Sequence, residues 1–191
     1  VRQIRSLADS MSSSDIRFEF SPEEFTDTDT DFALEICQVA FDEWGKATTE
    51  RPMILNLPAT VERRPPNHYA DMIELFIRNF PSREKVLISL HAHNDQGMAV
   101  AATELAIQAG GDRVEGTLFG HGERTGNVDI VTLANNLHSR GIDTGLDFRR
   151  LSSIAATVER LTGMPIYYRQ PYSGQYVFTA SAVYTGLMLL P

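Results

Sequence analysis

Short apolar segments alternate with longer amphipathic segments along most of the chain. The segment "VLISL" (86–90) is apolar at nearly every position, which is typical of a strand covered on both faces. The segment "QGMAVAATELAIQAG" (96–110) follows it with hydrophobic residues at intervals of three and four, which is typical of an amphipathic helix. The same reasoning predicts strands over residues 15–20, 53–57, 86–90 and 113–119, and helices over residues 28–44, 65–80, 96–110, 127–141 and 148–163.

Residues at the segment ends support these elements. Threonine and aspartate residues are available to cap helix 28–44, and a proline lies near the first turn of helix 65–80. Gly110 and Gly111 end the third helix, and Gly141 ends the fourth. Successive strand–helix units predict an α/β fold in which crossover helices join parallel strands. The pattern alone leaves open whether this is an open doubly wound sheet or part of a TIM barrel, which takes roughly 250 residues in full.

The composition is that of an ordinary globular protein, and it excludes several classes of partner. The chain has 191 residues, of which 42% are hydrophobic and 22% charged, enough for one domain with a core. The net charge of −8 argues against non-specific nucleic-acid binding and against an anionic membrane surface, and no segment approaches the length of a membrane span. The single cysteine, Cys37, lies in an apolar helical pattern and is expected in the core. We therefore expect a reducing compartment: the cytoplasm, or the stroma or matrix of an organelle.

Polar and ionisable residues follow each predicted strand, in the segments "SPEEFT", "PATVERR", "HAHND" and "GHGERTGN". The carboxyl ends of parallel strands form the edge where such folds collect functional groups. His91 and His93 are separated by one residue, so their side chains point to the same face of an extended segment. Two imidazoles at this spacing suit a divalent metal such as zinc, manganese or cobalt, with Asn94 or Asp95 orienting a ring. The alternative is a polar loop in which Asn94 and Asp95 cap the next helix.

Other residues at this edge have two interpretations each. Asn127 follows a loop with three glycines, "FGHGERTGN", and either caps the fourth helix or offers its side-chain oxygen to the same metal. Glu23 or Glu24 either begins a helix or serves as a general acid or base. Thr60 is a turn residue or a substrate contact, and the adjacent acid and base at 123–124 read most simply as a solvated ion pair.

Five motifs together resemble those of the 2-isopropylmalate synthases, within the wider family of metal-dependent acyl-CoA condensing enzymes and lyases. They are "FEFSPEEFTDTD", "LNLPATVE", "PNHYADMIE", "LISLHAHNDQGMAVAATELAIQAGGDRVEGTLFGHGERTGNVDIVTLANNL" and "RQPYSGQYVFTA". The resemblance runs from about residue 15 to residue 180. It implies that residues 1–147 form strands five to eight of a TIM barrel. Residues 148–191 would then be a post-barrel helix and the start of a linker or subdomain, in which about the last 11 residues are atypical of the family.

The resemblance also implies an activity. The family condenses acetyl-CoA with 3-methyl-2-oxobutanoate, the entry step to leucine, with a divalent metal (Mg, Mn or Zn) as cofactor, and its members are homodimers. The resemblance assigns metal ligation to His91, His93 and Asn127, catalysis to the carboxylate of Glu23, and keto-acid contacts to Ser21 and Thr60.

One departure from the family pattern limits what the isolated chain is expected to do. The family carries an Arg-Asp-Gly motif on its first barrel strand, whose Asp is a further metal ligand, and this sequence has no such motif. We therefore expect the isolated chain to be inactive. Three alternatives stay open: a related condensing enzyme such as homocitrate or citramalate synthase, a metal-dependent hydrolase of the amidohydrolase kind, and an α/β module that only binds a metal or an anion.

Overall fold

The computed structural model describes residues 1–179, so the predicted atypical segment at the end of the chain lies outside the described residues. The chain divides into two compact units, Val1–Val128 and Asp129–Pro191. The predicted domain boundary between residues 147 and 148 stays a prediction. In the described part, none of the helices combines the length and apolar character needed to cross a bilayer.

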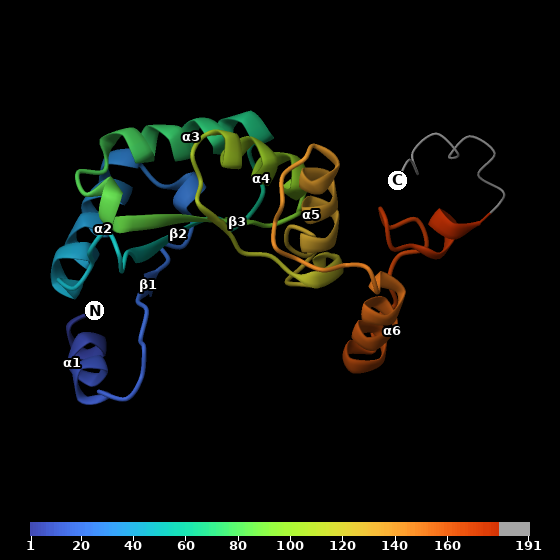
Figure 1. Cartoon of the computed structure of the whole chain (residues 1–191). Helices are drawn as coiled ribbons and strands as arrows, with labels where there is room; N and C mark the ends of the chain where they lie inside the picture. Colours follow the sequence, from blue (N-terminus) through green and yellow to red (C-terminus); the bar gives the residue numbers. More distant parts are fainter. Residues whose placement is uncertain (180–191) are drawn as a thin grey trace. The chain divides into compact units, whose positions relative to one another are not determined.

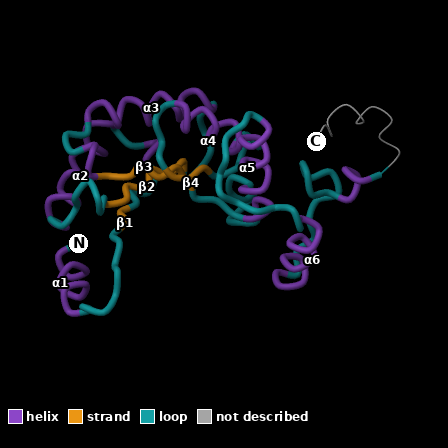
Figure 2. Tube along the Cα trace, in the orientation of Figure 1, coloured by secondary structure: helices purple, strands orange, loops and turns teal. Residues whose placement is uncertain are grey.

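The first unit is built on a four-stranded parallel sheet in the order β1-β2-β3-β4 (Figures 1 and 2). This confirms the α/β class with parallel pairing, and it is consistent with part of a TIM barrel. The strands are β1 (Glu19–Phe20), β2 (Met53–Ala59), β3 (Val86–Ala92) and β4 (Arg113–Val114).

Helices connect the strands. The first unit contains α1 (Arg2–Ser10), α2 (Thr30–Trp44), α3 (Pro66–Asn79) and α4 (Ala99–Gln108), with 3₁₀ turns at Phe25–Asp27, Arg83–Lys85 and Leu118–Gly120. The second contains α5 (Ile130–Ser139), α6 (Leu151–Thr162) and a 3₁₀ turn at Gln175–Phe178. The predicted helices all exist, whereas the hydrophobic pattern did not predict α1. Its apolar residues stay largely exposed, Leu7 at 66%, so this helix buries none of its side chains.

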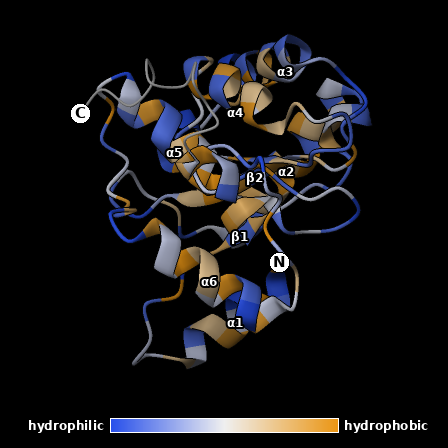
Figure 3. Ribbon diagram, turned by 90° about the vertical axis from the view of Figure 1, so that its right-hand side faces the viewer, coloured by the Kyte–Doolittle hydropathy of each residue, from blue (hydrophilic) through white to orange (hydrophobic). Residues whose placement is uncertain are grey.

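The two faces of the sheet differ in polarity. On one face, buried side chains such as Leu55, Leu57 and Ile88 pack beneath α3 and α4, and Figure 3 shows hydrophobic residues around β1 and β2 beneath the helices. On the other face, Asn56 lies opposite Ser89 in the strand register, and Ser89 lies opposite Arg113. Cys37 of α2 is fully buried, which confirms its predicted place in the core.

The predicted first strand (15–20) is too long, because a proline ends the ladder. Ile54 donates to the carbonyl of Phe18, and the next bond of this parallel ladder would run from residue 52 to residue 16. Residue 52 is Pro52, which has no N–H to donate. The guanidinium of Arg51 donates to the carbonyl of Ile16 instead, at 2.8 Å, and only Glu19–Phe20 form a strand.

The predicted fourth strand (113–119) is also too long, because a later segment takes its place beside β3. Glu115 still donates to the carbonyl of Leu90, but the carbonyl of Ala92 accepts from Val128 rather than from Thr117. Thr117 donates to Val128 in turn. The chain that returns from the glycine-rich loop therefore lies between β3 and the end of the predicted strand, which brings Asn127 beside β3.

Candidate metal centre

The two histidines lie at the carboxyl end of β3, and their rings face the same side, as the spacing predicts. The ring centroids are 5.4 Å apart and the ring planes differ by only 8°. His93 donates from its backbone to the carbonyl of Ala59 and forms an isolated bridge with Asn127. Both imidazoles are therefore fixed by strand pairing on either side of β3.

Asn127 contacts the first histidine from the glycine-rich loop. Its Nδ2 lies 3.2 Å from Nε2 of His91, and only 8% of its surface is exposed. A Cβ added at Gly122 would lie 2.0 Å from Oδ1 of Asn127, so the loop needs a glycine here to make room for the amide. The alternative interpretation, that Asn127 caps the fourth helix, is wrong: α5 begins at Ile130 and Asp129 caps it by accepting from Val131.

The three side chains suit a single cation. The oxygen and nitrogen of an amide are assigned from its hydrogen bonds, and turning the Asn127 amide would place Oδ1 where Nδ2 now lies, 3.2 Å from Nε2 of His91. Two donors that each bind a cation at about 2.1 Å and at a right angle are about 3 Å apart. In the described part of the chain no cluster of three or more His, Cys, Asp or Glu side chains could hold a metal, so the amide is needed as the third donor.

The predicted substrate residues lie on the neighbouring strand ends and connect to the histidines. Thr60 accepts from the backbone of Glu24 at 2.8 Å and donates to Oε2 of Glu23 at 3.1 Å. Ser21 accepts from Nδ2 of Asn56 at 2.9 Å, and the same nitrogen lies 3.3 Å from Nδ1 of His91. Of the two adjacent glutamates, Glu23 is the one that faces Thr60.

Arg124 is a member of the site that the sequence pattern did not single out. Its guanidinium lies 3.0 Å from Nδ1 of His93 and donates to Asp95 at 2.7 Å and to the carbonyl of Thr60 at 2.6 Å. It thus joins three strand-end loops, whereas Glu123, its expected partner, is 3.6 Å away and 80% exposed. Of the two residues proposed to orient a histidine ring, Asp95 binds Arg124, and Asn94 accepts from the backbone at the start of α4.

These contacts set the charge of His93. Burial, followed by the charges of Arg124 and His91, lowers the pKa of His93, which favours the neutral imidazole that binds metals. The hydrogen bond from Arg124 lowers the pKa of Asp95 to about 2. Because a neutral imidazole has one free nitrogen lone pair and Arg124 now faces it, cation binding by His93 requires Arg124 to move away from Nδ1.

A row of charged residues lies on the polar face of the sheet below the histidines. Arg113 donates to Oε2 of Glu19 at 2.9 Å and also binds Glu115, whose Oε2 lies 3.4 Å from Nδ1 of His91. Burial, and then the neighbouring Glu115 carboxyl, raises the pKa of Glu19. Burial opposes ionisation of Glu115, but hydrogen bonds from Ser89 and Glu19 and the charge of Arg113 lower its pKa. Of the two carboxyl groups, Glu115 is therefore the one whose surroundings favour the ionised form more strongly.

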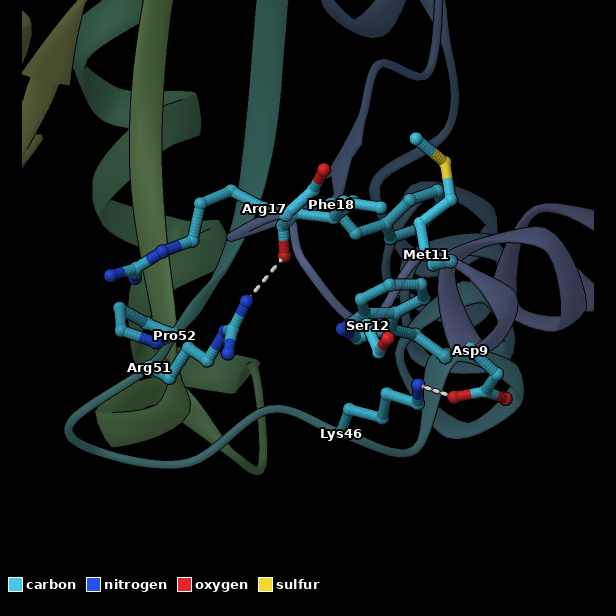
Figure 4. Close-up of a pocket in the computed structure, with 12 residues that line it drawn as sticks. Asp9, Met11, Ser12, Arg17, Phe18, Lys46, Arg51 and Pro52 are labelled. Atoms are coloured by element: carbon cyan, nitrogen blue, oxygen red, sulfur yellow. Dashed lines mark hydrogen bonds and ion pairs between the residues drawn. The ribbon is translucent and has the colours of Figure 1, made fainter.

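A separate cavity of about 270 Å³ lies at the opposite end of the strands, between α1 and the start of β1 (Figure 4). Its lining includes Phe18 stacked on Trp44, and Lys46 paired with Asp9. In the described chain it contains none of the predicted site residues. The predicted site is therefore the cluster at the carboxyl ends of the strands and not this cavity.

Comparisons with known proteins show the family and the fold. The HMGL-like family model matches residues 1–158. The 2-isopropylmalate synthase of Rhodospirillum rubrum is 54% identical over 173 residues, which is 91% of this chain and 31% of that protein. The 2-isopropylmalate synthase of Parvibaculum lavamentivorans is 54% identical over 179 residues, which is 94% of this chain and 32% of that protein. The chain thus spans about a third of the length of these curated relatives.

Solved structures match at the level of the fold. The HMG-CoA lyase of Bacillus subtilis superposes with a TM-score of 0.68 and 21% identity, over 87% of this chain and 56% of that one. An HMG-CoA lyase from Acinetobacter baumannii, solved with coenzyme A and 3-methylmalate, superposes with a TM-score of 0.66 and 18% identity, over 85% of this chain and 54% of that one. The resemblance to 2-isopropylmalate synthases is confirmed, and the chain belongs to the HMGL-like family.

Proposed function

We propose that this chain provides the cation-binding and keto-acid-binding part of a 2-isopropylmalate synthase active site. The observation that carries the proposal is the meeting of the His91, His93 and Asn127 side chains at the carboxyl end of β3. The names of the relatives support acetyl-CoA and 3-methyl-2-oxobutanoate as substrates. The coenzyme A bound in the Acinetobacter lyase supports an acyl-CoA partner for this fold.

The donor set indicates which cation the site would hold. Two imidazoles and one amide oxygen suit manganese or zinc better than magnesium, which prefers oxygen donors and bound waters. When bound, a divalent cation would polarise the ketone carbonyl of the keto acid as a Lewis acid.

The hydroxyl groups beside the cluster would orient the keto acid, and the carboxyl group would transfer a proton at its ketone oxygen. Ser21 and Thr60 each place a hydroxyl at the end of a strand, where it can donate to an oxygen of the substrate. Glu23 accepts a hydrogen bond from Thr60 at 3.1 Å. Its carboxylate would therefore lie close to a substrate oxygen bound by the Thr60 hydroxyl. We assign Glu23 the proton transfer at the oxygen that becomes the product hydroxyl.

Calorimetry on the purified chain tests the proposal. Titration with MnCl₂ should show one site, and 3-methyl-2-oxobutanoate should bind only after Mn²⁺ is present. His91→Ala and His93→Ala should each weaken Mn²⁺ binding at least about 10-fold, because each removes one donor. His68→Ala is the matched control, since His68 lies in α3 and lines a different pocket, beside Arg64 and Asp71. Mn²⁺ binding that survives both strand variants unchanged would contradict the proposal.

A further inference from the structure

We propose that Glu115 is a positioning residue that holds His91 in the tautomer and orientation needed to present Nε2 to the cation. The inference rests on the proposed function, because it concerns one of the three proposed donors. Glu115 lies just after β4, and its backbone donates to Leu90 in the neighbouring strand.

The carboxylate of Glu115 is fixed through one oxygen and leaves the other for the histidine. Oε1 accepts from the hydroxyl of Ser89 at 2.7 Å and from the guanidinium of Arg113 at 2.5 Å. Oε2 is then 3.4 Å from Nδ1 of His91. Ser89 is fully buried on the adjacent strand β3 and Arg113 lies two residues before Glu115, so a carboxylate that turned away from the histidine would lose both bonds.

The other ring nitrogen indicates which tautomer this contact favours. Nδ2 of Asn127 lies 3.2 Å from Nε2 of His91, so in this arrangement Nε2 accepts and its lone pair points toward the amide. This arrangement leaves the ring proton on Nδ1, on the side of the ring that faces Oε2 of Glu115 at 3.4 Å. A cation would use the same Nε2 lone pair, so the tautomer that Glu115 favours is the one that binds a cation at this position.

A competing contact at Nδ1 favours the opposite tautomer. Nδ2 of Asn56 lies 3.3 Å from Nδ1 of His91 and, as a donor, would favour an unprotonated Nδ1. The same NH₂ group donates its other hydrogen to Ser21 at 2.9 Å, and Oδ1 of Asn56 is buried without a partner among the described residues, so turning this amide would let Oδ1 accept from Nδ1 instead. The Asn56 contact therefore fixes no tautomer by itself, and the negative charge of Glu115 beside Nδ1 favours the proton on that nitrogen.

The test combines a tautomer measurement with a metal titration on the full chain. Imidazole ¹⁵N shifts of His91, assigned by comparison with His91→Gln, report which nitrogen carries the proton without any metal. Glu115→Ala removes the carboxylate, and Glu115→Gln keeps a neutral side chain of the same length in case the alanine variant folds poorly. Glu19→Gln is the matched control: Glu19 binds the same Arg113 at 2.9 Å and also bonds Glu115, a bond that glutamine can still make, and in the described structure no hydrogen bond or ion pair joins it to His91.

We expect the Nδ1–H tautomer in the native chain and a mixture of tautomers in Glu115→Ala. Mn²⁺ affinity should fall about 10- to 100-fold in Glu115→Ala, less in Glu115→Gln, and by under about threefold in Glu19→Gln. The positioning role is overturned by an Nε2–H tautomer in the native chain, by an unchanged tautomer in Glu115→Ala, or by an equal loss of affinity in Glu19→Gln. A native chain that keeps the Nδ1–H tautomer but binds no Mn²⁺ would overturn the proposed function and leave the positioning role standing.

Discussion

At the scale of single residues, Gly122 is a position where one added carbon would act directly on a proposed cation ligand, Asn127. The Gly122→Ala variant would place a Cβ 2.0 Å from Oδ1 of Asn127, so the amide must move away from His91. We expect Mn²⁺ affinity to fall about 10-fold, comparable to loss of a supporting contact. In an Asn127→Ala background the same glycine change should have much less effect, since the amide is gone and only the backbone nitrogen of residue 127 stays close, at 3.3 Å. Equal losses in both backgrounds would show that the glycine acts through the backbone.

Cys37 gives a prediction about pH. Burial raises the pKa of its thiol to about 12, so almost no reactive thiolate is present near pH 8. The chain has one cysteine, so a thiol reagent should react slowly with the native protein and quickly once urea unfolds it. Immediate reaction of the native chain would contradict this.

The same shift has a consequence for stability. An unfolded thiol ionises near pH 8.5, so between about pH 8.5 and 12 the folded state keeps a proton that the unfolded state releases. Stability should therefore fall as pH rises through this range. Urea unfolding at pH 7 and pH 10 should show a smaller decline in Cys37→Ala than in the native chain. The measurement at pH 7 is the reference for each protein, because there the thiol of the native chain is protonated in both the folded and the unfolded state.

At the scale of elements, a side chain of α3 takes part in the pairing of β2 with β3. The hydroxyl of Tyr69 accepts from the backbone of His91 at 3.2 Å and donates to the carbonyl of Leu57 at 2.6 Å. The next bond of this ladder, from His93 to Ala59, is direct. Tyr69 therefore stands in the ladder next to the proposed donor His91 and links the helix to the site.

Tyr69→Phe tests this link. It leaves a buried N–H and a buried carbonyl without their partner, so we expect a loss of about 1–3 kcal/mol in unfolding free energy and weaker Mn²⁺ binding. Tyr172→Phe is the matched control: it also removes a hydroxyl bond, at 2.7 Å to Asn136, but from an exposed side chain. Urea unfolding should show a change within about 0.5 kcal/mol for the control. Equal losses in the two variants would argue against a special role for Tyr69.

The elements also show what the sequence could predict. The helices and the two central strands follow from local hydrophobic periodicity, and the shared orientation of His91 and His93 follows from strand geometry. The ends of β1 and β4 depend on Pro52 and Val128, which are distant in sequence and not encoded in local periodicity. Arg124, Glu115 and Tyr69 were missed for the same reason, because their roles come from contacts between separate strands and helices.

At the scale of the whole molecule, we predict metal binding without turnover. The chain spans about a third of its curated relatives, and the described residues offer two histidines and an amide but no acidic third donor. Release of free CoA from acetyl-CoA and 3-methyl-2-oxobutanoate should be undetectable with the purified chain and clear with the full-length synthase of Rhodospirillum rubrum. Turnover by the chain that His91→Ala abolishes would contradict this prediction.

The bond between Arg113 and Glu19 has a consequence for how the sheet assembles. The two residues belong to the outer strands β4 and β1, which in a flat sheet are about 14 Å apart, so their long side chains reach toward each other across the two central strands. They are also 94 positions apart in sequence, and their bond can form only after every strand between them has docked. It should therefore be absent from the folding transition state. In stopped-flow kinetics Glu19→Gln should speed unfolding and leave the folding rate nearly unchanged.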